Sequence, residues 1–144
     1  LDALPDDLRR AIEGKTLNHD SSHDSGGNLR PNHQMFTSLA EAPGARHPII
    51  RKHPDTGRPA LFLGRRLHAW IVGMDVAQSD ALLDRLWEHC LQEDFTYRHE
   101  WQPGDLLMWD NRVTMHRRDP FDGGARRVMH RTQLKGIAGV EAAA

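Results

Sequence analysis

The sequence has little cysteine, little lysine and no long apolar run, and each shortage excludes a class of protein. Cys90 is the single cysteine, so no internal disulfide can form, and a reducing cytoplasmic compartment is expected. No apolar run approaches the roughly 20 residues of a membrane span, and no secretory leader is visible. A net charge of −1 argues against a general nucleic-acid-binding protein.

The basic residues that are present are mostly of one kind. Sixteen arginines stand against three lysines, and six of those arginines fall between Arg112 and Arg131. Arginine binds carboxylates and sulfonates through a forked pair of hydrogen bonds, so a small anionic ligand is favoured. The ten histidines suggest a metal site. Cys90 lies on the apolar stripe of a predicted helix, which favours a buried, inert thiol over a nucleophile.

Two segments have the pattern of helices. Residues 4–14 begin with a proline and two aspartates and end on Gly14, which are helix start and stop signals. Residues 77–91 repeat apolar side chains at three- and four-residue spacing, and Asp75 or Ser79 could cap their start. Between these two helices, residues 15–46 are polar and show no periodicity. We expect a long mobile loop or lid there.

The remaining segments read as short strands joined by glycine and proline turns. The predicted strands cover residues 47–53, 59–64, 68–74, 94–101, 106–110, 112–116 and 126–136. The chain of 144 residues is long enough for one modest core, so residues 1–144 are predicted to belong to one domain. Many short strands with flanking helices predict a mainly β protein, either a β-sandwich or a jelly roll.

One block, residues 101–131, holds the side chains best suited to chemistry. His116 ends one predicted strand, and Arg127 and Arg131 lie on one face of the next, roughly 13 Å apart at about 3.3 Å per residue. One imidazole and two guanidinium groups suit a metal ion and two anions. The alternative from this pattern alone is that the arginines lie on a solvated face and that His116 is an ordinary edge histidine.

The same block carries a resemblance to a known family. WDNR, followed three residues later by histidine, and then RRVMHR at this spacing resemble the C-terminal half of the taurine dioxygenase and 2,4-dichlorophenoxyacetate dioxygenase family. The resemblance covers residues 4–136. It implies a double-stranded β-helix (jelly roll) and an Fe(II)/2-oxoglutarate-dependent dioxygenase that self-associates. Such an enzyme uses O2 to hydroxylate a small anionic organic substrate while it decarboxylates 2-oxoglutarate to succinate.

The resemblance also implies a role for three residues. His116 matches the distal histidine of the family's iron site, which has two histidines and one carboxylate. Arg127 matches the arginine that binds the far carboxylate of 2-oxoglutarate, and Arg131 matches the one that binds the anionic group of the substrate. Within WDNR we expect Trp109 to pack in the core and Asp110 or Asn111 to fix the turn.

The family's other two iron ligands form a His-x-Asp pair, and no convincing pair is present. The one match, 53–55, lies in a turn, and the adjacent His-Asp pairs at 19–20 and 23–24 have the wrong spacing and are expected to be solvated. The chain also begins at Leu1 instead of a methionine. We therefore expect the C-terminal portion of a longer enzyme, inactive by itself.

Two questions stay open at this stage. A non-catalytic β-sandwich that binds an anion or serves in assembly would also lack the His-x-Asp pair. The substrate could be an aryloxyalkanoate-type carboxylate, an alkyl sulfonate or a sulfate. Residues 64–70 and 15–46 are expected to shape its pocket, but their sequence does not specify which anion is bound.

Overall fold

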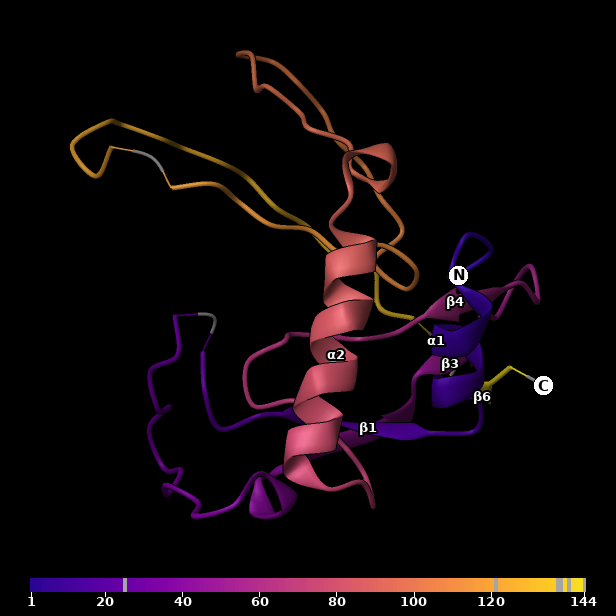
Figure 1. Ribbon diagram of the computed structural model, residues 1–144. Coiled ribbons are helices and arrows are strands. Elements are labelled where there is room, and N and C mark those ends of the chain that lie inside the picture. The colour runs from indigo at the N-terminus through magenta and orange to yellow at the C-terminus, as the bar shows by residue number, and fades with distance from the viewer. Residues whose placement is uncertain (25, 121, 137–138, 140, 144) are drawn as a thin grey trace.

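The computed structural model describes residues 1–24, 26–120, 122–136, 139 and 141–143 of the chain. Residues 1–95 and 141–143 form a body of helices and small sheets (Figure 1). Residues 96–136, which we call the arm, extend from the end of the long helix in two lobes that reach away from the body (Figure 1). The arm therefore contributes little to the core, although it carries the residues singled out above.

The body contains two three-stranded antiparallel sheets. In the first, β1 (Thr16–Asp20) lies between β2 (Gly44–Pro48) and β5 (Trp70–Ile71). In the second, β3 (Ile50–Lys52) lies between β4 (Pro59–Leu61) and β6 (Glu141–Ala142). Strands β3 and β4 form a hairpin, as the proline, aspartate and glycine between them predict. Single 3-10 turns cover Leu39–Glu41 and Glu93–Phe95.

Both predicted helices are confirmed with slightly different ends. Helix α1 (Asp6–Ile12) follows Pro5 and has two aspartates in its first turn, where they oppose the positive end of the helix dipole. Helix α2 (Val76–Cys90) is capped by the Asp75 carboxylate, which accepts a hydrogen bond from the backbone N–H of Gln78 at 3.1 Å. Ser79, the other candidate cap, is fully buried and accepts the backbone N–H of Ile71 instead.

The core lies between the two helices and the two sheets. Its fully buried apolar members come from both helices, from the first sheet and from residues next to the strands of the second sheet: Ile12, Leu17, Ile49, Leu63, Ile71, Leu83 and Leu86. Each such aliphatic side chain contributes about 1.5–3 kcal/mol by leaving water. Cys90 is only half-buried against this core, and burial raises the pKa of its thiol, which keeps it protonated and supports the inert reading.

The expectation of a loop without elements over residues 15–46 is wrong. Strand β1 and most of β2 fall inside that range and pair over five residues, from Thr16 opposite Pro48 to Asp20 opposite Gly44. The sequence of β1 is polar, and its burial depends on hydrogen bonds instead of apolar alternation. The Asn18 side chain, for example, donates to the backbone oxygen of Ala42 at 2.9 Å.

The four strands predicted between residues 94 and 136 are also absent from the described part of the arm. Their alternating apolar side chains are exposed, among them Leu106, Met108, Val128 and Leu134. A strand forms only where a neighbour accepts its hydrogen bonds, and the described residues offer the arm no such neighbour. The β-sheets with flanking helices are thus confirmed in the body alone. No helix among the described residues is long and apolar enough to cross a membrane.

Candidate functional site

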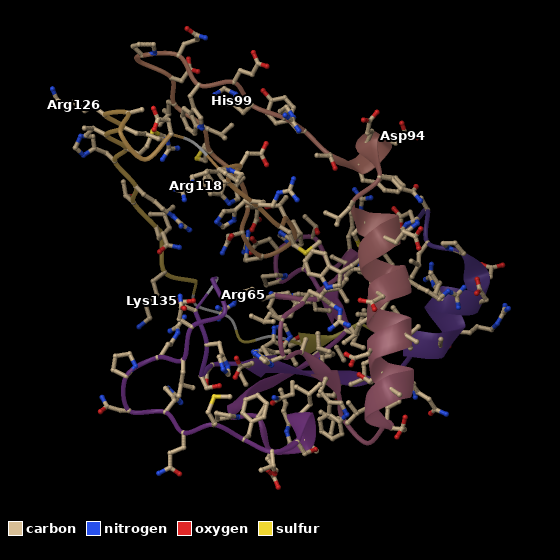
Figure 2. All side chains as sticks on the ribbon, turned by 60° about the vertical axis from the view of Figure 1, so that its left-hand side comes forward. Arg65, Asp94, His99, Arg118, Arg126 and Lys135 are labelled. Atoms are coloured by element: carbon tan, nitrogen blue, oxygen red, sulfur yellow. The ribbon has the colours of Figure 1, made fainter. Side chains whose placement is uncertain are left out.

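The three predicted site residues all lie in the arm and are exposed. His116 lies shortly after the turn at residues 111–113, and Arg127 and Arg131 lie four residues apart in the last stretch of the arm. Figure 2 shows the side chains of this region, with His99 and Arg126 on the arm well away from the sheets. Since no strand forms among the residues of the arm that the structure describes, the shared strand face predicted for Arg127 and Arg131 is not present.

Trp109 nevertheless brings two of the three residues together. Its indole ring contacts the His116 imidazole, with ring centroids 5.1 Å apart, and the Arg131 guanidinium carbon lies 5.8 Å from the indole centroid. The second distance is within the range of a cation–π interaction. Trp109 is 36% exposed, so the prediction that it packs in the core is wrong. Its position links the candidate metal ligand to the candidate substrate arginine.

Asp110 fixes the turn between Trp109 and His116, as predicted. Its carboxylate accepts hydrogen bonds from the backbone N–H and the guanidinium of Arg112 at 2.7–3.1 Å, and its backbone oxygen accepts from Val113 and Thr114. A further hydrogen bond comes from His53 of the body, at 3.0 Å. These donors stabilise the charged carboxylate and hold the pKa of Asp110 well below its usual range.

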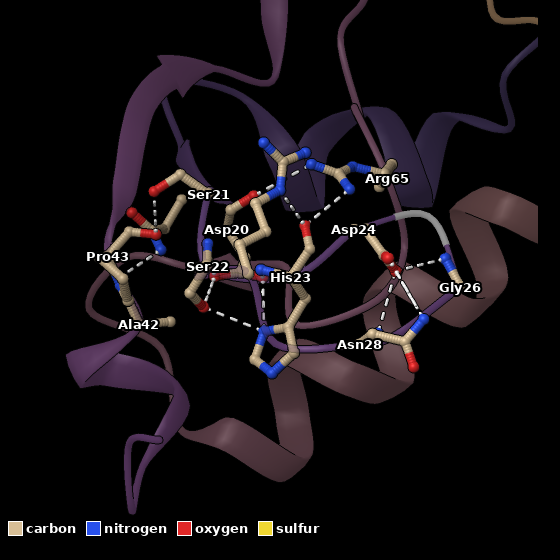
Figure 3. Close-up of polar contacts among 12 residues, drawn as sticks. Asp20, Ser21, Ser22, His23, Asp24, Gly26, Asn28, Ala42, Pro43 and Arg65 are labelled. Atoms are coloured by element: carbon tan, nitrogen blue, oxygen red, sulfur yellow. Dashed lines mark hydrogen bonds and ion pairs between the residues drawn. The ribbon is translucent and has the colours of Figure 1, made fainter. Parts of the chain in front are cut away.

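Each adjacent His-Asp pair in the body has one buried residue, so the expectation that these pairs are solvated is wrong for Asp20 and His23. His23 is 3% exposed and Asp20 is 8% exposed. The Asp20 carboxylate lies 2.9 Å from the His23 Nδ1 and accepts the backbone N–H and the hydroxyl of Ser22 (Figure 3). The two guanidinium groups of Arg30 and Arg65 converge on the backbone oxygen of His23. Asp20 therefore ties the end of β1 to the loop that follows it.

The rings of His19, His47 and Phe62 form a second group in the body. The centroid of the His19 ring lies 5.2 Å from that of His47 and 5.0 Å from that of Phe62, and the Nε2 of His19 is buried without a partner. Burial, and to a lesser degree the nearby His47, lowers the pKa of His19 to about 4. A neutral imidazole is thus held between the sheets.

The donor set of the described residues does not fit an iron centre. A facial iron site needs two histidines and one carboxylate around one point. Among residues 1–24, 26–120, 122–136, 139 and 141–143, no group of three histidine, cysteine, aspartate or glutamate side chains could hold a metal ion. The one His-x-Asp match is engaged elsewhere, because His53 binds Asp110 and Asp55 pairs with Arg112 at 2.7 Å. His116 is at most one ligand of such a site.

Comparison with known proteins places the chain in a family. Residues 1–133 match the family model described as taurine catabolism dioxygenase TauD, TfdA family. The chain belongs to this family, which confirms the resemblance read from WDNR and RRVMHR.

Similar proteins support the assignment. The (S)-phenoxypropionate/alpha-ketoglutarate-dioxygenase of Sphingobium herbicidovorans is 35% identical over 99% of this chain and 51% of its own length. A crystal structure of a candidate alpha-ketoglutarate dependent 2,4-D dioxygenase from Burkholderia xenovorans matches with a TM-score of 0.62 and 33% identity, over 78% of this chain and 43% of that one. AAD-2, solved with Mn(II) and N-oxalylglycine, matches with a TM-score of 0.55 and 30% identity, over 70% and 39%. The chain thus spans about half the length of such relatives.

Proposed function

We propose that this chain is the C-terminal part of an Fe(II)/2-oxoglutarate-dependent dioxygenase that hydroxylates a small anionic organic substrate. The reaction would be coupled to decarboxylation of 2-oxoglutarate to succinate and would consume O2. Membership of the TauD, TfdA family supports the reaction class. The solved relative with Mn(II) and N-oxalylglycine, an analogue of 2-oxoglutarate, supports the metal and the co-substrate.

The observation that carries the proposal is the contact of His116 and Arg131 with one indole ring, that of Trp109. An imidazole and a guanidinium gathered on one side chain can hold a metal-bound reactant and an anion close to each other. Without that contact the two residues would be independent side chains of an exposed segment. Trp109 therefore supports the interpretation of this segment as a binding site over the alternative of a solvated face.

The two arginines have separate roles in this proposal. Arg127 binds the far carboxylate of 2-oxoglutarate, and the forked geometry of guanidinium suits this group because both carboxylate oxygens can be bound at once. Arg131, four residues later, binds the anionic group of the substrate. The names of the relatives favour an aryloxyalkanoate carboxylate or an alkyl sulfate, since one acts on phenoxypropionate and another, 32% identical, is an alkylsulfatase from Acinetobacter baylyi.

The oxidation itself depends on iron ligands that the described residues do not supply. We propose that a further segment of the protein provides a histidine and a carboxylate to complete the site with His116. The same segment would pair with the exposed apolar side chains of the arm and complete a jelly roll. This explains why the arm shows alternating apolar residues but forms no strands.

The test is succinate formation by the full-length protein that contains this chain. With Fe(II), O2, 2-oxoglutarate and a panel of phenoxyalkanoates and alkyl sulfates, we expect substrate-dependent succinate. His116→Ala should abolish it, and His130→Asn, an exposed control in the same arm, should leave it unchanged. Anion binding without any succinate would contradict the proposal and favour a non-catalytic anion-binding module.

A further inference from the structure

The arm is attached to the body by polar contacts at one turn. His53 and Asp55, both in the turn between β3 and β4, bind Asp110 and Arg112 of the arm at 3.0 and 2.7 Å. Of these two contacts the first is the better shielded, because His53 is 8% exposed. The ion pair between Asp55 and Arg112 is more solvated and is expected to contribute less. The hydrogen bond between His53 and Asp110 is therefore the main candidate for an anchor.

The hydrogen bonds around His53 indicate which of its two ring nitrogens carries the proton. Its Nδ1 accepts the backbone N–H groups of Asp55 and Thr56, each at 3.2 Å. A nitrogen that accepts two N–H groups must keep its lone pair, so in the neutral ring the proton is on Nε2. That Nε2–H then donates to the Asp110 carboxylate. The turn is also closed by backbone hydrogen bonds, from the N–H of His53 to the oxygen of Arg58 and from the N–H of Gly57 to the oxygen of His53.

Asp110 connects His53 to the candidate site. Its carboxylate and its backbone oxygen together organise the turn from Arg112 to Thr114, and His116 follows two residues later. On its other side, Asp110 directly follows Trp109, the ring that contacts both His116 and Arg131. A shift of Asp110 would therefore move the candidate metal ligand and the candidate substrate arginine together.

We propose that His53 is a positioning residue, which sets the placement of His116 and Arg131 through its hydrogen bond to Asp110. In this role it acts through Asp110, and not by direct contact with substrate or co-substrate. The proposal rests on the proposed function for its effect on turnover, but the anchor itself can be tested without any activity. A hydrogen bond to a charged group contributes about 1.5–3 kcal/mol, which corresponds to a tenfold or larger change in an equilibrium constant.

Two substitutions of His53 distinguish the role of Nε2 from that of Nδ1. In His53→Gln the amide can reach the place of Nε2 and donate to Asp110, although the acceptor for the turn is lost. In His53→Asn the oxygen can replace Nδ1 as acceptor, but the side chain is too short to reach Asp110. In the full-length protein we expect His53→Asn to lower kcat/KM by about tenfold, while His53→Gln stays within about threefold of wild type. Lys52→Gln, at the exposed neighbouring position, is the control.

Two measurements on the same protein do not depend on activity. Nitrogen-15 NMR of wild type should show the Nε2 of His53 carrying a proton, and amide exchange at Val113 and Thr114 should be faster in His53→Asn than in His53→Gln. An Nε2 without a proton, or equal exchange and equal kcat/KM in the two variants, would overturn the anchor. If wild type makes no succinate, the proposed function fails, and the tautomer and the exchange rates still decide on the anchor.

Discussion

The indole of Trp109 contacts the imidazole of His116, with ring centroids 5.1 Å apart and ring planes inclined by 52°. The two residues are seven positions apart, and the turn fixed by Asp110 brings them together. The same indole lies under the guanidinium of Arg131. A tryptophan at this position therefore brings an imidazole and a guanidinium group together instead of filling the core.

Replacing this ring should weaken substrate binding. Trp109→Leu removes the aromatic face under Arg131, and a cation–π contact at an exposed site is worth about 0.5–1 kcal/mol, so we expect KM for an anionic substrate to rise about two- to fivefold. Trp109→Phe keeps an aromatic ring, so its KM should lie between those of wild type and Trp109→Leu. Steady-state kinetics of the full-length protein provide the measurement. Trp101→Leu, which removes an exposed ring elsewhere in the arm, is the control, and equal effects at both positions would count against a specific role for Trp109.

Gly64 should be far less tolerant of substitution than Gly14. Both glycines have positive φ, at 64° and 66°, so alanine is strained at either position by about 1–2 kcal/mol. At Gly64 a Cβ would also collide with the His19 ring, whereas nothing lies within 4 Å of a Cβ at Gly14. The difference between the two alanine variants in the free energy of unfolding isolates this collision. We expect Gly64→Ala to be the less stable variant by about 1–3 kcal/mol. Equal losses in the free energy of unfolding would mean that the His19 ring can move aside at no cost.

The buried imidazole of His19 should make stability depend on pH. Its pKa of about 4 in the folded chain lies below the ordinary value near 6.5, so the unfolded chain binds more protons between these two values. The contribution of His19 is therefore complete above pH 6.5 and is lost as pH falls through 4. Allowing for the partial exposure of the ring, we expect a loss on the order of 1–2 kcal/mol.

Chemical denaturation at pH 7 and pH 4.5 checks this dependence. His19→Asn should lose less stability than wild type over that interval, because it removes the titrating group. His130→Asn is the matched control, since His130 is exposed in the arm. A pH dependence that is identical in wild type and His19→Asn would assign the effect to other groups, of which His47 is the nearest.

Some of the fold could be predicted from local patterns. Helix α2 follows from its leucine spacing and the Asp75 cap, and the β3–β4 hairpin follows from the turn between its strands. Strand β1 could not be predicted, because Asn18 and Asp20 are buried by hydrogen bonds to residues that lie elsewhere in the chain or in its loops. Burial of a polar strand depends on partners, which periodicity does not reveal.

The candidate site was predicted as a set of residues but not as an arrangement. The spacing of WDNR, His116 and the two arginines indicated the family, which the match over residues 1–133 confirms, while the roles of these residues stay predictions. The sequence contains the turn at His53 and the motif at Asp110 as two separate signals, 57 residues apart, and no local pattern shows that they touch. The alternating apolar residues of the arm predicted strands, because such alternation indicates one face that can be buried in a sheet. The pattern does not show whether a neighbouring strand is present to bury that face.

The binding of 2-oxoglutarate by Arg127 tests the central claim most directly. Arg126 is its neighbour, is also exposed and carries the same charge, so Arg126→Ala is a control for the loss of one positive charge. Titration calorimetry of the full-length protein with 2-oxoglutarate should show an affinity lower by about tenfold or more in Arg127→Ala and nearly unchanged in Arg126→Ala, because a charge-assisted forked pair is lost in the first variant alone. Equal affinities in Arg127→Ala and wild type would contradict the account.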